Sequence, residues 1–277
     1  MAGKTTKDMT SGSPMKLILG FMIPMLFGFL FQQFYNMMDT IIVGKYLGVT
    51  ALAAVGSTGS INFMIIGFCN GVCSGFAIPV AQKFGEKNES AMRRYVANSG
   101  WLAAVFAGVM TVVGCLLCRN IQTWMRTPED IFDQAYIYIF IIFLGIPATY
   151  LYNMLAGIIR SLGDSTTPLV FLLISSVMNI ILDLFTIIVL KMGVAGAAWA
   201  TVISQYISAA LVLRCLIQTE ADYRLELSKL RVVKHKLCAI IQIGLPAGLQ
   251  GAIFSISNVL IQSSINSFGS VAMAGST

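Results

Sequence analysis

Two acidic residues of this chain lie inside long apolar stretches, where chemistry is the usual reason for an acid. Ten of the twelve Asp and Glu residues fall in loops, in the amino-terminal tail or at the ends of apolar stretches, whereas Asp39 and Asp183 do not. An unpaired charge at the centre of a bilayer costs about 3 kcal/mol or more, so acids there are rare and commonly functional. Asp39 and Asp183 are therefore the first candidates for a site.

Amide and hydroxyl residues accompany these acids. Asn179 precedes Asp183 by four residues and so shares its helix face, and Thr201 in the next apolar stretch is expected at a similar depth. With Asp39 they form an all-oxygen cluster, which suits Na⁺, a hard cation, or a proton shared by two carboxyl groups. The alternative is that each Asp is protonated and hydrogen-bonded within a helix bundle, or faces water at a helix end.

Further polar residues lie one or two helical turns before Asp39 and are candidates for lining a substrate cavity. They are Gln32, Gln33, Tyr35 and Asn36. Tyr near a membrane end is also a common interfacial anchor, so both roles stay open for this set.

Seven apolar stretches are long enough to position these residues across a membrane. The chain is 57% hydrophobic and 11% charged, against about 25% charged in ordinary soluble domains. A bilayer core needs about 20 apolar residues in a helix, which satisfies its own backbone. We therefore predict an all-α integral membrane protein. The expected spans are 17–43, 49–81, 95–117, 131–157, 168–190, 194–217 and 239–265.

Lys and Arg are distributed unequally between the two sides of these spans. Fourteen of the 18 lie on the side of the amino terminus, and the other side holds Lys45, Arg119, Arg126 and Lys191. Because cytoplasmic loops carry the excess of positive charge, the sequence predicts a multi-pass plasma-membrane protein with a cytoplasmic amino terminus. Topology and attraction to anionic lipid explain the net charge of +6 without a nucleic-acid partner.

Glycine and proline mark where the helices pack closely or bend. Gly67, Gly71 and Gly75 form a ridge of small residues, which lets a neighbouring helix approach closely. Pro147 falls in the middle of the 131–157 span, where it frees a carbonyl and permits a bend.

The sequence around Pro24 is repeated around Pro246, 222 residues later, and an Asn follows each Pro by twelve positions, at Asn36 and Asn258. The offset contains six expected spans, so both copies cross the membrane in the same direction. This repeat predicts two parallel six-helix lobes in a protein of about 440 residues, of which this chain would be a fragment. The alternative is chance similarity between two apolar helices. The expected divisions are a cytoplasmic tail (1–16), the first six-helix lobe (17–217), a cytoplasmic inter-lobe linker (218–238) and the start of the second lobe with its first helix (239–277).

Three separated motifs occur in order: QFYNMMDT at 33–40, RSLGDSTTP at 160–168 and GVAGAAWAT at 193–201. With the acids and the repeat, they resemble the MATE (multidrug and toxic compound extrusion) family, from about residue 15 to the end of the chain. The resemblance implies a twelve-helix exporter of two lobes without a cofactor. Such an exporter moves drug-like, often cationic, small molecules outward and H⁺ or Na⁺ inward.

The resemblance also implies that the coupling ion binds in the first lobe. The implied ion-binding residues are Asp39, Asn179, Asp183 and Thr201, with Asn153 nearby. The expected spans place Asn153 near the cytoplasmic end of 131–157, well below Asp183, so either this helix is displaced or Asn153 supports the ligands from behind. The chain lacks most of the second lobe, which would be its partner in transport.

Two other functions were weighed against an exporter. A flippase for lipid-linked precursors, in the same superfamily, would want several cationic residues lining its cavity for phosphate, and the spans are nearly free of Lys and Arg. An intramembrane enzyme would need a reactive motif, but the sequence has no HExxH, GxSxG or Walker pattern, and its one histidine, His235, lies in a basic loop. We therefore predict a transporter and no enzyme.

Overall fold

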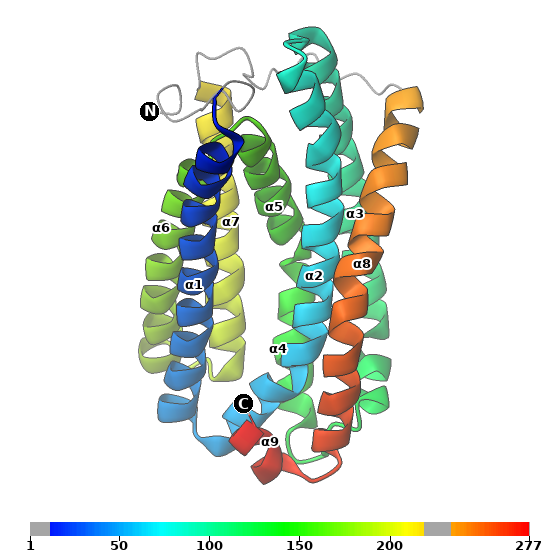
Figure 1. Cartoon of the computed structure of the whole chain (residues 1–277). Coiled ribbons are helices and arrows are strands. Elements are labelled where there is room, and N and C mark those ends of the chain that lie inside the picture. Colours follow the sequence, from blue (N-terminus) through cyan, green and yellow to red (C-terminus); the bar gives the residue numbers. More distant parts are fainter. Residues whose placement is uncertain (1–11, 219–233, 277) are drawn as a thin grey trace.

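The computed structural model describes residues 12–218 and 234–276, and these form helices and no strand (Figure 1). Six described helices are long and apolar enough to cross a membrane, and a seventh span results if α4 and α5, which meet at 44°, count as one. The predicted all-α fold is confirmed, and the described helices account for six of the predicted spans, or for all seven if the bent pair counts as one. The elements are α1 (Pro14–Leu47), α2 (Val49–Gly85), α3 (Glu89–Trp124), α4 (Phe132–Leu144), α5 (Ile146–Ser161), α6 (Thr166–Leu184), η2 (Phe185–Val189), α7 (Val194–Gln218), α8 (Lys234–Asn266) and α9 (Ser270–Ser276).

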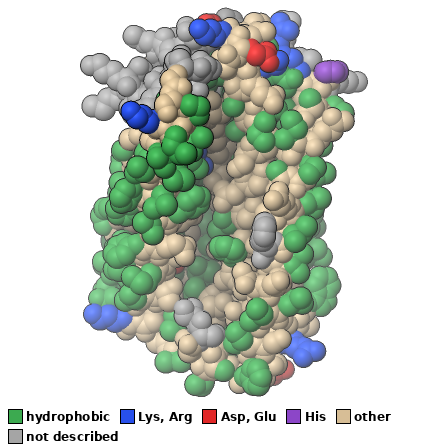
Figure 2. Space-filling model, in the orientation of Figure 1, with side chains coloured by type: hydrophobic (Ala, Val, Ile, Leu, Met, Phe, Trp, Pro, Cys, Tyr) green, Lys and Arg blue, Asp and Glu red, His purple; other side chains and the backbone are tan. Residues whose placement is uncertain are grey.

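The helices form two groups joined by the bent pair α4 and α5. Figure 1 shows α1, α6 and α7 on one side and α2, α3 and α8 on the other. Both α4 and α5 pack against α7 in the first group and against α2 and α3 in the second. The space-filling view shows a hollow between the side of α1 and the side of α2 and α8 (Figure 2).

The bend between α4 and α5 follows from the local sequence. Pro147 has no N–H to donate, so it cannot continue the hydrogen-bond ladder from α4. The helix breaks at Gly145, whose N–H donates to the carbonyls of Ile141 and Ile142 over 3.2 and 2.9 Å. The bend expected at Pro147 is therefore present, and it changes which neighbours the residues of α5 meet.

Helix α1 is held loosely by the rest of the described chain. No residue in the most apolar 18-residue part of α1 is buried. Many of its large apolar side chains are exposed, such as Phe29 (62% exposed) and Leu30 (56% exposed). It packs mainly against α6. Lipid, or a further part of the protein, would cover the rest of this surface.

Helices α2 and α8 pack backbone to backbone along a seam of glycines, which confirms the ridge predicted on α2. A Cβ added at Gly75 would lie 2.5 Å from the Cα of Gly244, and one at Gly67 would lie 3.0 Å from the carbonyl oxygen of Gly251. Only glycine leaves room for this approach. The facing pairs are Gly67 with Gly251, Gly71 with Ala247 and Gly75 with Gly244.

The end of α8 distant from Lys234 is also attached to the first helices. The Asn266 amide nitrogen donates to the carbonyl oxygen of Met125, over 2.8 Å, in a buried position. Met273 of α9 is fully buried in an apolar cluster that includes Ala53 and Ile131. In this chain, α8 and α9 therefore pack with helices that precede residue 219. Most of the predicted inter-lobe linker (218–238) lies outside the described residues.

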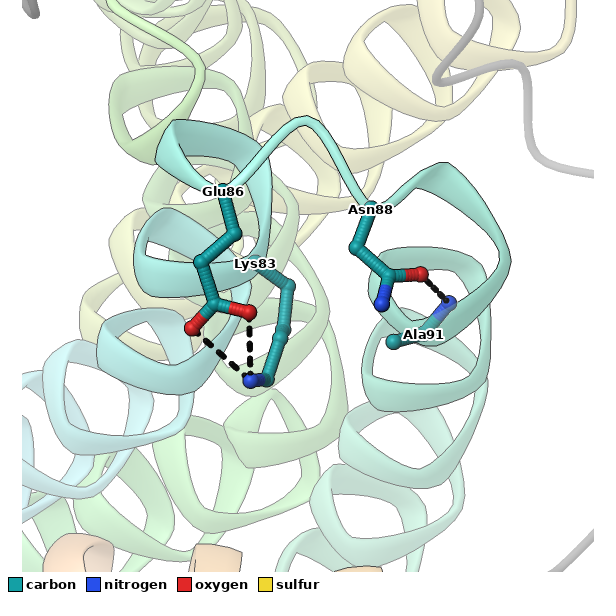
Figure 3. Close-up of polar contacts among 4 residues, drawn as sticks. All are labelled: Lys83, Glu86, Asn88 and Ala91. Atoms are coloured by element: carbon teal, nitrogen blue, oxygen red, sulfur yellow. Dashed lines mark hydrogen bonds and ion pairs between the residues drawn. The ribbon is translucent and has the colours of Figure 1, made fainter.

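The turn between α2 and α3 lies at the same end of the molecule as the start of α1 (Figure 1), and it contains charged side chains (Figure 3). Lys83 at the end of α2 forms an ion pair with Glu86, with 2.7 Å between Nζ and Oε2. Asn88 caps α3, because its side-chain oxygen accepts from the N–H of Ala91 over 3.1 Å. These contacts fix a short connection between two antiparallel helices.

The seam makes a testable prediction at Gly71. Replacing Gly71 by Ala would drive a Cβ into the backbone at Ala247 and should destabilise the chain by about 1–3 kcal/mol. Replacing Gly108 of α3 by Ala is the matched control, because nothing lies within 4 Å of its added Cβ; helix propensity there should be neutral or stabilising by up to about 1 kcal/mol. Thermal unfolding in detergent measures both. Equal unfolding temperatures for the two variants would contradict the seam.

Candidate ion-binding site

Helix α6 has one polar face, and this face is buried. Ser175, Asn179 and Asp183 follow one another at intervals of four residues, and all three are buried. The opposite face is apolar and exposed, for example at Val177 (58%) and Ile181 (55%). In a membrane, such a helix turns its apolar face to lipid and its polar face to the other helices, which brings Asp183 inside.

Asn179 joins Asp183 to α7. With the amide nitrogen of Asn179 turned toward the carboxylate, it donates to Asp183 Oδ2 over 2.8 Å, and the amide oxygen accepts from the backbone N–H of Thr201 over 3.2 Å. The Thr201 hydroxyl donates to the carbonyl oxygen of Ala197 over 3.1 Å, so its lone pairs are left to accept. The three residues predicted on these two helices are thus in contact.

Helix α1 brings the second acid to this group. The carboxyl groups of Asp39 and Asp183 lie within hydrogen-bonding reach of each other. Among the described residues, one oxygen of each, Asp39 Oδ1 and Asp183 Oδ1, is buried without a hydrogen-bond partner. Two facing carboxylates away from water repel each other unless a proton or a cation lies between them. The unsatisfied oxygens and the all-oxygen donor set fit either H⁺ or Na⁺.

Two tyrosines complete the surroundings of the carboxyl pair. The Tyr35 side chain, from α1, lies close to the side chain of Thr201 and in electrostatic range of both acids. Tyr138, from α4, is buried, and its hydroxyl lies in electrostatic range of both acids and of Tyr35. Sequence reasoning missed Tyr138, although a tyrosine seven residues inside the 131–157 span could have indicated a polar partner there.

The other predicted residues lie elsewhere. Gln33 and Asn36 are exposed, and the Asn36 amide nitrogen donates to Gln33 Oε1 over 3.4 Å. Asn153 donates to the carbonyl oxygen of Thr149 in its own helix over 2.8 Å, and its side chain lies close to that of Cys69 on α2. It faces α2, and the structure does not bring it to the carboxyl pair.

The backbone changes directly after Asp183. Helix α6 ends at Leu184 and continues as the π-helix η2, a wider turn that often marks functional positions in long helices. The Thr186 hydroxyl donates to the carbonyl oxygen of Leu182 over 2.9 Å, across this change. Such a turn has no signature in the sequence that hydropathy could detect.

Comparison with known proteins gives a consistent relationship. The family model MatE matches residues 24–185. The chain is 32% identical over 265 residues to the probable multidrug resistance protein YoeA of Bacillus subtilis (strain 168), covering 92% of this chain and 56% of the relative. It thus spans little more than half the length of that protein.

Solved structures agree. One is the outward-facing conformation of a multidrug resistance MATE family transporter of the MOP superfamily, at 26% identity and a TM-score of 0.86. The match covers 97% of this chain and 59% of the chain of that transporter. An inward-facing conformation of such a transporter matches 88% of this chain and 56% of its own, at 25% identity and a TM-score of 0.80. The outward-facing structure is matched over more of the chain.

Proposed function

This chain belongs to the MatE family, and we propose that it forms the ion-binding lobe of a secondary exporter, which moves drug-like, often cationic, organic molecules outward in exchange for H⁺ or Na⁺. Members of this family are transporters and not enzymes, so the chain is part of a transporter. The observation that carries the proposal is the facing pair of Asp39 and Asp183, each with a buried oxygen that has no partner in the described chain. Similar proteins named for multidrug resistance support the choice of substrate.

The arrangement of the helices suggests how ion binding is used. Asp39 is carried by α1, which is loosely packed, whereas Asp183 is carried by α6, which packs along α7. An ion between the two carboxyl groups would hold α1 against α6 and α7. Losing that ion would leave two repelling charges and release α1, which also contains Pro24 as a point of bending. Export is coupled to the ion if substrate prefers the released arrangement.

The rest of the proposal concerns partners and location. A second lobe of the same protein would cover the exposed face of α1 and complete the pathway. The excess of Lys and Arg on the amino-terminal side favours a plasma-membrane protein with that terminus in the cytoplasm. The flippase alternative lacks the set of cations in the membrane interior that a phosphate substrate would require.

Replacing either acid by its amide tests the pair. In cells that express the two-lobe protein, Asp39→Asn and Asp183→Asn should each lower efflux of a fluorescent organic cation by about 5- to 150-fold, because the amide cannot exchange a proton or balance Na⁺. Membrane abundance should stay the same. Asp133→Asn is the matched control, since Asp133 is exposed in the first turn of α4 and should leave efflux unchanged. Normal efflux from both variants would refute the assignment of the site.

Removing the ion gradients one at a time identifies the coupling ion. In sodium-free medium, a protonophore should stop export by a proton-coupled protein, and an inward Na⁺ gradient should then restore it only if Na⁺ also binds the pair. The readout is efflux of the same fluorescent cation. Export that persists without either gradient would contradict ion-coupled antiport.

A further inference from the structure

Three cations from three helices lie near one another at one end of the glycine seam, where α2 ends and α8 begins. They are Lys83 at the end of α2, Arg94 near the start of α3 and Lys236 near the start of α8. The positive charges of Arg94 and Lys83 repel that of Lys236. Figure 2 shows Lys and Arg side chains gathered at this end of the molecule.

Tyr95 fixes the position of Lys236. The Lys236 ammonium lies 4.6 Å from the centre of the Tyr95 ring, a cation–π contact between α8 and α3. Tyr95 also lies in electrostatic range of Lys83. Lys236 and Lys83 therefore lie near one aromatic side chain, which Arg94 directly precedes in α3, and the ring supplies no negative charge to balance them.

Acidic side chains only partly balance these cations. Glu86 is bound to Lys83, with Nζ 2.7 and 2.8 Å from its two oxygens (Figure 3). Among the residues that the structure describes, the charges that act on Lys236 are the like charges of Arg94 and Lys83. A group of cations held together against their repulsion is stabilised by an anion from outside the described chain.

The position of the group indicates which anion is present. It lies where α2 ends and where α3 and α8 begin, on the side that carries most of the Lys and Arg. In the proposed orientation, this is the level of the lipid headgroups. Basic pockets between membrane-spanning helices on this side are suited to phosphate groups of anionic lipids. Tyrosine at this level is a usual neighbour of headgroups.

We infer that the phosphate of an anionic phospholipid from the cytoplasmic leaflet binds between Lys236 and Arg94, beside Tyr95. Bound there, the lipid ties the start of α8 to α3 and α2, and it adds an electrostatic attachment to the glycine seam. Removal of the lipid leaves the repulsion between the cations unbalanced and weakens the attachment of α8. This inference rests on the proposed orientation, with the amino terminus in the cytoplasm, and not on the exporter activity.

The test compares lipid retention after two positive charges are removed at this site with lipid retention after two are removed on the opposite side of the membrane. The purified chain in neutral detergent is mixed with phosphatidylglycerol, phosphatidylcholine or inorganic phosphate, and bound lipid is counted by native mass spectrometry. Wild type should retain phosphatidylglycerol in preference to phosphatidylcholine. The double variant Lys236→Gln/Arg94→Gln should retain about 5-fold less per charge removed. The single variant Arg94→Gln, at an exposed position, tests the site with little effect on folding.

The control is Lys45→Gln/Lys191→Gln, which removes the same charge from the side that carries four of the 18 Lys and Arg residues. It should retain phosphatidylglycerol as wild type does. Equal retention by wild type and the Lys236/Arg94 variants, or equal retention of the two lipids, would overturn the inference. If inorganic phosphate displaces the lipid at equal concentration, the anion is free phosphate and the lipid assignment is wrong.

Discussion

The cost of charge away from water is the constraint on which this structure depends. Asp39 and Asp183 come from helices far apart in the sequence, and neither could remain inside a bilayer as a lone carboxylate. Facing each other, they can share one proton or one cation, and Asn179 and Thr201 supply the remaining polar contacts. Under the proposed function, the association of α1 with α6 depends on an ion in a way that ordinary apolar packing does not.

The rest of the fold divides into parts that are held tightly and parts that are not. The seam between α2 and α8 brings backbones together at Gly71 and Gly75, where even a methyl group finds no space. Helix α1 has no such contacts and exposes most of its apolar surface. A change in the occupancy of the carboxyl pair would therefore move α1 more readily than α2 or α8.

The site was largely predictable because its signals are local. Acids are conspicuous in apolar stretches, and a spacing of four residues places Asn179 beside Asp183 on any helix. Tyr138 was missed because a tyrosine in an apolar stretch resembles a packing residue until its neighbours are known. The position of Asn153 depends on the bend at Gly145, which sets the side of α5 that meets α2. The glycine ridge was visible in the sequence, but its partner, α8, lies far along the chain and only the tertiary structure identifies it.

Infrared difference spectroscopy of the chain in lipid membranes tests the shared carboxyl site most directly, because it observes the carboxyl groups themselves. Spectra are recorded on changing pH or adding Na⁺, for wild type, Asp39→Asn and Asp183→Asn. If the two groups share one ion, replacing either acid should shift or remove the carboxyl band of the other, since coupled groups titrate as a pair. Two independent bands, each unchanged when the other acid is replaced, would contradict a shared site.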